Sequence, residues 1–155
     1  MPLRRASHCV YDCQYHLVWT PKRRRVVLGG AVGQRLEELF REIGEEYDIW
    51  IEEMHVAEDH VHLYCAFPPR LSVSQVVTRF KSLSARYLFR EFPELRARCW
   101  SRELWESGYF VRTVGDKVTG EIVRRYIQRH RDNALVTEED DLQLDLQLDL
   151  PHLDL

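Results

Sequence analysis

Apolar and polar positions follow two kinds of pattern along this chain, one typical of strands and the other of helices. Stretches rich in aromatic and β-branched residues, bounded by turn-forming residues, favour strands. Longer stretches in which apolar residues recur at helical spacing favour amphipathic helices. These patterns predict strands at 8–20, 48–57, 60–67 and 108–114, and helices at 31–47, 72–91 and 117–132.

This order of elements predicts an α+β fold of the ferredoxin-like kind. The order is β-α-β-β-α-β, followed by one extra helix. In that fold the first and third strands are the central ones of an antiparallel sheet, so residues 60–67 would lie mid-sheet on a rigid support. Ser72 is a suitable N-cap for the second helix. We expect residues 92–107 to be irregular.

Composition indicates one globular domain. Of the 155 residues, 45% are hydrophobic and 30% are charged. No apolar run approaches the roughly 18 residues that a membrane span needs, and the first residues lack the apolar stretch of a signal peptide. We therefore expect a cytoplasmic protein that binds no membrane. The four cysteines form no CxxC pair, which favours reduced thiols over disulfides or a zinc cluster.

Charge is distributed unevenly, and the segment 137–155 carries much of the acidity. It holds seven Asp and Glu and no Lys or Arg, whereas the whole chain has 22 Lys and Arg against 25 Asp and Glu. Without that segment the net charge is about +4, mostly from arginine, the side chain that best grips phosphate. The chain therefore divides into a domain at 1–136 and an acidic, low-complexity tail at 137–155.

Two interpretations of the tail stay open. Its repeated Asp-Leu-Gln-Leu has no β-branched residue, which favours a dispensable and partly disordered extension. Strict alternation is also typical of a strand, so an added edge strand or an acidic cover over the basic domain is the alternative.

The triplet His60-Val61-His62 is the first candidate for chemistry. Residues two apart in a strand point to the same face, so the two imidazoles project together while Val61 points to the other face. Two imidazoles on a fixed strand can hold one divalent ion if a third ligand arrives from elsewhere. By itself the pair is a weak signal, because two surface histidines in this pattern are the commoner case.

The last predicted helix adds Tyr126 and His130. They are four residues apart and therefore share one helical face. A tyrosine there can attack phosphorus, and His130 can complete a metal site. The alternatives are structural. Tyr126 would be an amphipathic cover for the core, and His130 would be a histidine that favours the C-terminal end of the helix dipole.

Several short motifs complete the pattern. They are Tyr15-His16-Leu17-Val18-Trp19-Thr20-Pro21-Lys22, Asp59-His60-Val61-His62-Leu63, Ser82-Leu83-Ser84-Ala85-Arg86, Phe89-Arg90-Glu91-Phe92-Pro93-Glu94-Leu95, Leu104-Trp105, Gly108-Tyr109-Phe110-Val111, Thr113-Val114-Gly115 and Arg125-Tyr126-Ile127. In this order and at this spacing they resemble the single-tyrosine HUH transposases of small bacterial insertion sequences, the TnpA type with its REP-associated relatives. The resemblance runs from about residue 8 to 133, and the tail has no counterpart in it.

The resemblance implies a nuclease and strand transferase that acts on single-stranded DNA folded into hairpins at the ends of an element. It assigns Mg²⁺ or Mn²⁺ binding to His60 and His62. It assigns to Tyr126 the role of the nucleophile that becomes joined to the 5′ phosphate. The third ligand of the family lies four residues after the tyrosine and is often glutamine. Here it is His130, so the identity of the metal stays open.

The resemblance also implies homodimers in which the tyrosine helix of one chain completes the metal site of the other, with Gly115 as a hinge. Basic side chains are the predicted DNA contacts. They are Lys22 and Arg23 in the loop after the first strand, and Arg79, Lys81 and Arg86 on the second long helix. An ordinary solvated helix face is the alternative for these charges.

Two other functions stay open at this point. A ferredoxin-like sheet with aromatic residues can bind single-stranded nucleic acid without chemistry, as a non-catalytic regulator derived from a transposase. The intact trio His60, His62 and Tyr126 argues against that function, since a binder has no use for it. A metal-dependent hydrolase of small phosphoesters would need the histidines but not Tyr126.

Overall fold

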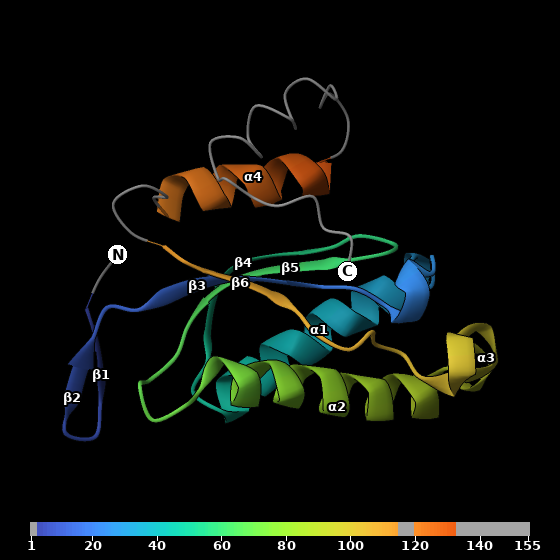
Figure 1. Ribbon diagram of the computed structural model, residues 1–155, viewed down its shortest axis with the longest axis horizontal. Coiled ribbons are helices and arrows are strands. Elements are labelled where there is room, and N and C mark those ends of the chain that lie inside the picture. Colours follow the sequence, from blue (N-terminus) through green and yellow to red (C-terminus); the bar gives the residue numbers. More distant parts are fainter. Residues whose placement is uncertain (1–2, 115–119, 133–155) are drawn as a thin grey trace.

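A four-stranded antiparallel sheet organises the computed structural model, which describes residues 3–114 and 120–132 (Figure 1). In order across the sheet, its strands are β4 (Trp50–Val56), β5 (Val61–Ala66), β3 (Gln14–Trp19) and β6 (Phe110–Thr113). Each neighbouring pair is antiparallel. The predicted first and third strands, β3 and β5, are therefore the central ones, as expected of this fold.

Helices cover both faces of the sheet. α1 (Gly30–Glu46) and α2 (Val73–Glu91) lie on one face, and α4 (Gly120–Asp132) lies on the other (Figure 1). The order β3-α1-β4-β5-α2-β6 confirms the predicted ferredoxin-like α+β fold, and α4 is the extra helix. No helix within the described ranges is long and apolar enough to cross a membrane.

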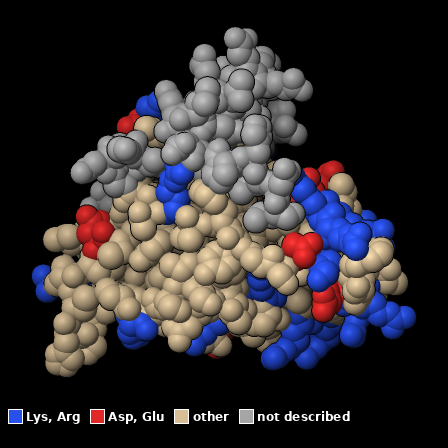
Figure 2. Space-filling view, in the orientation of Figure 1, with Lys and Arg blue, Asp and Glu red and all other residues tan. Residues whose placement is uncertain are grey.

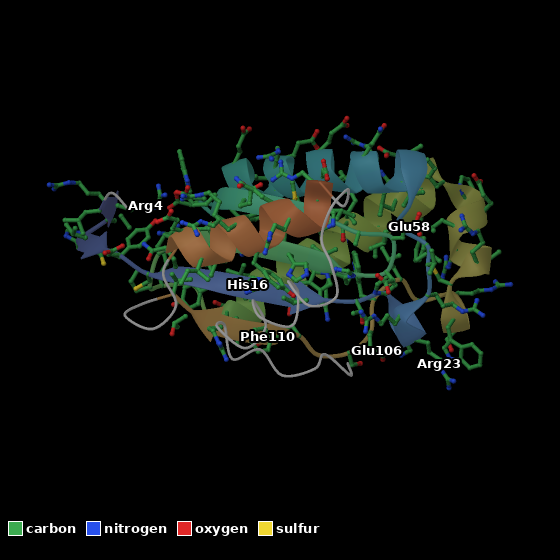
Figure 3. The ribbon with its side chains drawn as sticks, turned by 90° about the horizontal axis from the view of Figure 1, so that it is seen from above. Arg4, His16, Arg23, Glu58, Glu106 and Phe110 are labelled. Atoms are coloured by element: carbon green, nitrogen blue, oxygen red, sulfur yellow. The ribbon has the colours of Figure 1, made fainter. Side chains whose placement is uncertain are left out.

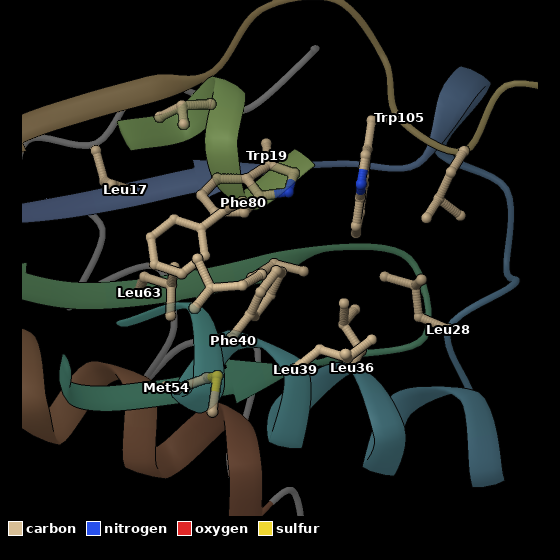
Figure 4. Packing of buried hydrophobic residues seen from close by; sticks show 14 of the residues in the cluster. Leu17, Trp19, Leu28, Leu36, Leu39, Phe40, Met54, Leu63, Phe80 and Trp105 are labelled. Carbon is tan, nitrogen blue, oxygen red and sulfur yellow. The ribbon is translucent and has the colours of Figure 1, made fainter. Parts of the chain in front are cut away.

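The main core lies between the sheet and the layer of α1 and α2. Alternate residues of the central strands point into it, among them Leu17 and Trp19 of β3. The Trp19 ring meets Phe40 of α1 and Phe80 of α2 at centroid distances of 5.7 and 6.1 Å (Figure 4). Burying each phenylalanine contributes about 1.5–3 kcal/mol. The three rings therefore join both helices firmly to the sheet.

The structure divides the first predicted strand, 8–20, into two. β2 (Cys9–Tyr11) pairs with β1 (Arg4–Ala6) in a separate two-stranded hairpin, and β3 begins at Gln14. β1 has three residues, two of which are arginines. It therefore lacks the apolar alternation by which a strand is recognised from sequence.

The stretch 92–107 contains two short helices where the sequence predicts irregular chain. α3 (Pro93–Arg98) starts with a proline, whose fixed φ suits the first helical position, and the 3₁₀ turn η2 (Trp100–Arg102) follows it. The basic loop after β3 likewise folds into a 3₁₀ turn, η1 (Lys22–Arg24). These elements are too short to show a periodic pattern. The tail at 137–155 lies outside the described residues.

The N-cap predicted at Ser72 is confirmed as a full capping box. The Ser72 hydroxyl accepts the Gln75 N–H at 3.0 Å, and the Gln75 side chain accepts the Ser72 N–H at 2.9 Å. Two backbone donors at the start of α2 are thereby satisfied.

Replacing Ser72 with Ala should lower the free energy of unfolding by about 1 kcal/mol, because the Gln75 N–H loses its acceptor. Urea denaturation followed by circular dichroism measures the change. Ser82→Ala, at an exposed position inside the same helix, is the matched control and should leave stability unchanged or slightly higher. Equal effects of the two substitutions would contradict the capping role.

Candidate active site

The face of the sheet under α4 carries a row of histidines. Because side chains alternate along a strand, His16 of β3 and His62 and Tyr64 of β5 point away from the aromatic core. In the register, His16 pairs with Tyr64, Val18 with His62, and His55 of β4 with His62. His16 lies on β3 beneath α4 (Figure 3). Three neighbouring strands therefore bring histidines to one part of the sheet.

His16 and His62 are hydrogen-bonded to each other. His16 Nε2 and His62 Nδ1 are 3.1 Å apart, and the two rings stack with their centroids 5.3 Å apart. Both residues are buried, with 0% and 2% of their surface exposed. Leaving a buried polar group without a hydrogen bond costs about 1–3 kcal/mol, so the bond stabilises both rings. Sequence reasoning missed His16 as a site residue, because only the register of β3 against β5 brings it to His62.

His60 lies just before β5 and is held by Asp59. Its Nδ1 is 2.7 Å from one carboxylate oxygen, and the other oxygen accepts a hydrogen bond from Arg24 Nε at 3.2 Å. Burial by itself would raise the pKa of Asp59, but the hydrogen bond to His60 and the charges of His60 and Arg24 outweigh it and lower that pKa. The ionised carboxylate thus fixes the His60 ring, whose centroid is 4.9 Å from that of His62.

Tyr126 faces the histidines from α4. Its ring centroid is 5.4 Å from that of His62 and 6.1 Å from that of His16, edge-on to both. Only 5% of the residue is exposed, since it also packs in a small cluster with Tyr64 and Val123. Tyr126 therefore covers the sheet, which is the structural role expected as an alternative, and it also contacts two histidines.

Acidic residues of β4 hold α4 on the sheet. A bulge in β4 interrupts its pairing with β5 next to Glu52 and Glu53. Arg124 of α4 lies 3.9 Å from Glu52. Gln128 donates to Glu53 at 3.2 Å, and Arg131 pairs with the same carboxylate. These contacts fix the rotation of α4 that turns Tyr126 toward the sheet.

The two histidines of the triplet have the chemistry of metal ligands. A metal-binding histidine typically has its second ring nitrogen hydrogen-bonded to a neighbouring group. Asp59 holds Nδ1 of His60 and His16 holds Nδ1 of His62, contacts that suit the tautomer whose Nε2 carries the lone pair a metal needs. No three His, Cys, Asp or Glu side chains form a metal cluster within the described residues. The predicted third ligand, His130, belongs to α4, but its side chain lies outside the described residues.

Three of the predicted DNA contacts, Arg79, Lys81 and Arg86, belong to α2 and so lie on the opposite face of the sheet from α4 (Figure 1). Arg79 stacks on the Tyr47 ring, 4.1 Å from its centroid. The Lys81 ammonium donates to two carbonyls of the loop before β6, at 2.8 and 2.6 Å, and desolvation lowers its pKa. Arg79 and Lys81 thus have packing partners within the protein, whereas Arg86 is exposed.

The other two predicted DNA contacts, Lys22 and Arg23, lie in η1. Lys22 pairs with two glutamates of the loop before β6, at 3.0 and 3.8 Å. The guanidinium of Arg23 lies over the Trp100 ring, 4.0 Å from its centroid. The ion pair of Arg24 with Asp59 connects this turn to the histidines. η1 is therefore next to the candidate site, unlike α2.

A family model for IS200-like transposases matches residues 9–130. The chain belongs to the IS200-like transposases. The ISDra2 transposase TnpA of Deinococcus radiodurans is 31% identical to it over 132 residues, which are 85% of this chain and 94% of that protein. The transposase for insertion sequence element IS200 of Salmonella typhimurium is 33% identical over 109 residues, which are 70% of this chain and 72% of that protein.

Solved structures agree with this assignment. A putative transposase from Deinococcus radiodurans has a TM-score of 0.68 at 30% identity and covers 86% of this transposase and 99% of its own chain. A REP-associated tyrosine transposase bound to a REP hairpin has a TM-score of 0.58 at 13% identity, over 78% of this chain and 67% of its own, which shows the fold alone. The family that the sequence motifs indicate is therefore confirmed.

Gly120, the first residue of α4, offers a test of how this helix lies on the sheet. A Cβ added there would collide with the Tyr64 hydroxyl, so Gly120→Ala should lower the free energy of unfolding by about 1–3 kcal/mol. That hydroxyl has no hydrogen-bond partner among the described residues, so Tyr64→Phe alone should cost little. The double variant should regain part of the stability of Gly120→Ala in urea denaturation. A double variant no more stable than Gly120→Ala would refute this contact.

Proposed function

We propose that this transposase cleaves single-stranded DNA at hairpin-bearing ends of its element and rejoins it, with Tyr126 as the nucleophile. The observation that carries the proposal is the meeting of Tyr126 with His62 and His16, at ring-centroid distances of 5.4 and 6.1 Å. A tyrosine beside imidazoles that can hold a divalent ion has the groups that covalent phosphoryl transfer needs.

DNA as the substrate is supported by the family and by one structural neighbour. The REP-associated tyrosine transposase, similar in fold, has been solved bound to a REP hairpin. We extend this to a hairpin with a single-stranded flank as the substrate of the present chain. Tyr126 is 5% exposed, and a flexible single strand can bring one phosphate close to such a covered side chain more easily than a stiff duplex can.

The first step is attack of the Tyr126 oxygen on phosphorus. A phenol has a pKa near 10, so it must lose its proton as it attacks. The bond from phosphorus to the 3′ oxygen breaks, and that oxygen takes up a proton and leaves as a 3′-OH. The 5′ phosphate stays joined to Tyr126, and rejoining to another 3′-OH therefore needs no ATP.

Mg²⁺ or Mn²⁺ is the proposed cofactor, with His60 and His62 as ligands and His130 as the third. When bound, it would neutralise charge that develops on the phosphoryl group. Nitrogen ligands favour Mn²⁺ over Mg²⁺, which prefers an octahedron of oxygens. The neighbours of the two imidazoles hold them in place: Asp59 does so for His60 at 2.7 Å, and His16 for His62 at 3.1 Å.

A homodimer that shares its active sites stays a prediction from the family resemblance. Within one chain, Tyr126 already lies against His62, so a second chain is not required to bring the two together. The predicted hinge, Gly115, lies outside the described residues.

Replacing Tyr126 with Phe should abolish covalent attachment of the protein to DNA. A library of single-stranded DNA with short hairpins and the native flanks of the element is incubated with Mn²⁺ and separated on a denaturing gel. The wild type should give a protein–DNA band that the variant lacks. Tyr87→Phe, which changes an exposed tyrosine of α2, should retain the band and serves as the control.

Binding without a covalent band in the wild type, with metal and native flanks present, would indicate the non-catalytic regulator instead. A covalent band that persists in Tyr126→Phe would show that another residue is the nucleophile. A released product with no covalent band would point to a hydrolase.

Removing His16 should weaken Mn²⁺ binding, because His62 loses the neighbour that holds its Nδ1. We expect His16→Ala to lower the affinity roughly 10- to 100-fold. His16→Gln, whose amide can still hydrogen-bond His62, should recover part of it. Isothermal titration of the protein with Mn²⁺ measures both, with His8→Ala in the exposed hairpin as control. An unchanged Mn²⁺ affinity in a folded His16→Ala protein would contradict this positioning role.

A further inference from the structure

Two tight turns, η1 and η2, form a basic corner at one end of the sheet. The segments 22–25 and 96–102, which contain these turns, hold seven Lys and Arg and no Asp or Glu. We call them the arginine corner. Lys and Arg side chains gather over this end of the molecule (Figure 2), and Arg23 projects from it beside an aromatic ring (Figure 3).

Direct contacts join the two segments of the arginine corner. Arg25 Nη1 donates to the Arg98 carbonyl at 3.0 Å. The guanidinium of Arg23 lies 4.0 Å from the centroid of the Trp100 ring. Residues far apart in sequence therefore form one continuous surface.

Backbone strain is concentrated in the arginine corner. Six non-glycine residues have a positive φ in the described part of the chain, and four of them lie here. They are Arg23, Arg24, Ser101 and Arg102, with φ of 55°, 51°, 54° and 56°. Glycine would adopt this left-handed conformation without strain, yet three of these four positions hold arginine. Strain of this kind gathers where a side chain has a function.

Much of the positive charge of the corner faces solvent. Lys22 pairs with Glu103, and Arg24 pairs with Asp59. The other five basic residues of the corner are exposed arginines, namely Arg23, Arg25, Arg96, Arg98 and Arg102. Within the described residues, the contacts seen for their guanidinium groups are to aromatic rings and to one carbonyl, not to carboxylates. Such a surface attracts a polyanion.

We infer that the arginine corner binds the single strand that adjoins the scissile phosphate, with Trp100 stacking on a base and the exposed arginines contacting phosphates. This inference rests on the proposed function. Arg24 lies 3.2 Å from Asp59, which lies 2.7 Å from His60, so the corner borders the site. Trp100 is 41% exposed, and a base on its open side would complete a stack with Arg23.

A single strand fits this surface better than a duplex does. Only an unstacked base offers its face to an indole ring, and base–aromatic stacking is tolerant of sequence. Arg23, already a predicted DNA contact, belongs to these exposed arginines, and Arg98, Trp100 and Arg102 join it as proposed contacts, whereas the Lys22 ammonium is paired with Glu103. No DNA contact is assigned to Arg79, Lys81 or Arg86 of α2.

The test measures fluorescence anisotropy of a labelled single-stranded oligonucleotide over a series of salt concentrations, in a Tyr126→Phe background that forms no covalent product. Trp100→Ala should weaken binding about fivefold or more through lost stacking. Arg102→Gly should weaken it and reduce the salt slope by about 0.7, the value for one lost phosphate contact on a single strand. Arg70→Gln is the control, because Arg70 is an exposed arginine outside the corner, just before α2, and pairs with Asp48.

Arg102→Gly also separates binding from folding. Glycine relieves the positive φ at this position, so the thermal midpoint should stay unchanged or rise while DNA affinity falls. Wild-type affinity and slope in both corner variants would overturn the inference. An equal loss of affinity for duplex DNA of the same sequence would also overturn it, because the corner would then bind the hairpin stem. The Tyr126→Phe cleavage assay does not depend on the corner variants. The inference about the corner and the proposal about Tyr126 can therefore fail separately.

Discussion

The pairing of β3 with β5 at the centre of the sheet is the constraint on which both faces of the protein depend. A slip of one residue in this register would exchange Leu17 and Trp19 of the core for His16 and Val18. The imidazole would then lie among aromatic rings without its partner, at the cost of an unmade hydrogen bond. The present register instead gives an apolar core on one face and the bonded pair of His16 and His62 on the other. The geometry of the candidate site is therefore fixed by the same pairing that fixes the core.

α4 is held on the sheet by a different kind of contact from α1 and α2. Its buried cluster is small and consists of Tyr64, Val123, Tyr126 and Ile127, and polar contacts to Glu52 and Glu53 supply much of the rest. Partly exposed ion pairs contribute only about 0–1 kcal/mol each, far less than the aromatic core under the other two helices. The element that carries the proposed nucleophile is thus packed on the sheet through a smaller apolar cluster than α1 and α2 are. This suits the proposed mechanism, in which Tyr126 stays attached to DNA between cleavage and rejoining.

Local patterns predicted what depends on neighbours in sequence. Periodicity gave the order of strands and helices, and alternation around Val61 placed His60 and His62 together. The role of His16 depends on long-range register, which no local pattern reveals. The turns η1 and η2 were not predicted, because three residues are too few to show a periodic pattern. The positive φ of their arginines has no signature in composition. The basic charge of α2 also led to the prediction that Lys81 contacts DNA, but its ammonium donates hydrogen bonds to two backbone carbonyls of the protein.

Asp59 is the point at which the histidine site and the arginine corner meet. A carboxylate beside a phosphate-binding surface would repel DNA if its charge were uncompensated. Here one oxygen contacts His60 and the other contacts Arg24, so its charge is balanced locally while its lowered pKa keeps it ionised. The carboxylates Glu52 and Glu53 are likewise covered by arginines of α4. Because these three carboxylates are paired with basic neighbours, they oppose an approaching strand less, and the exposed arginines of the corner add a positive potential at this end of the protein, although the whole chain carries a net charge of −3.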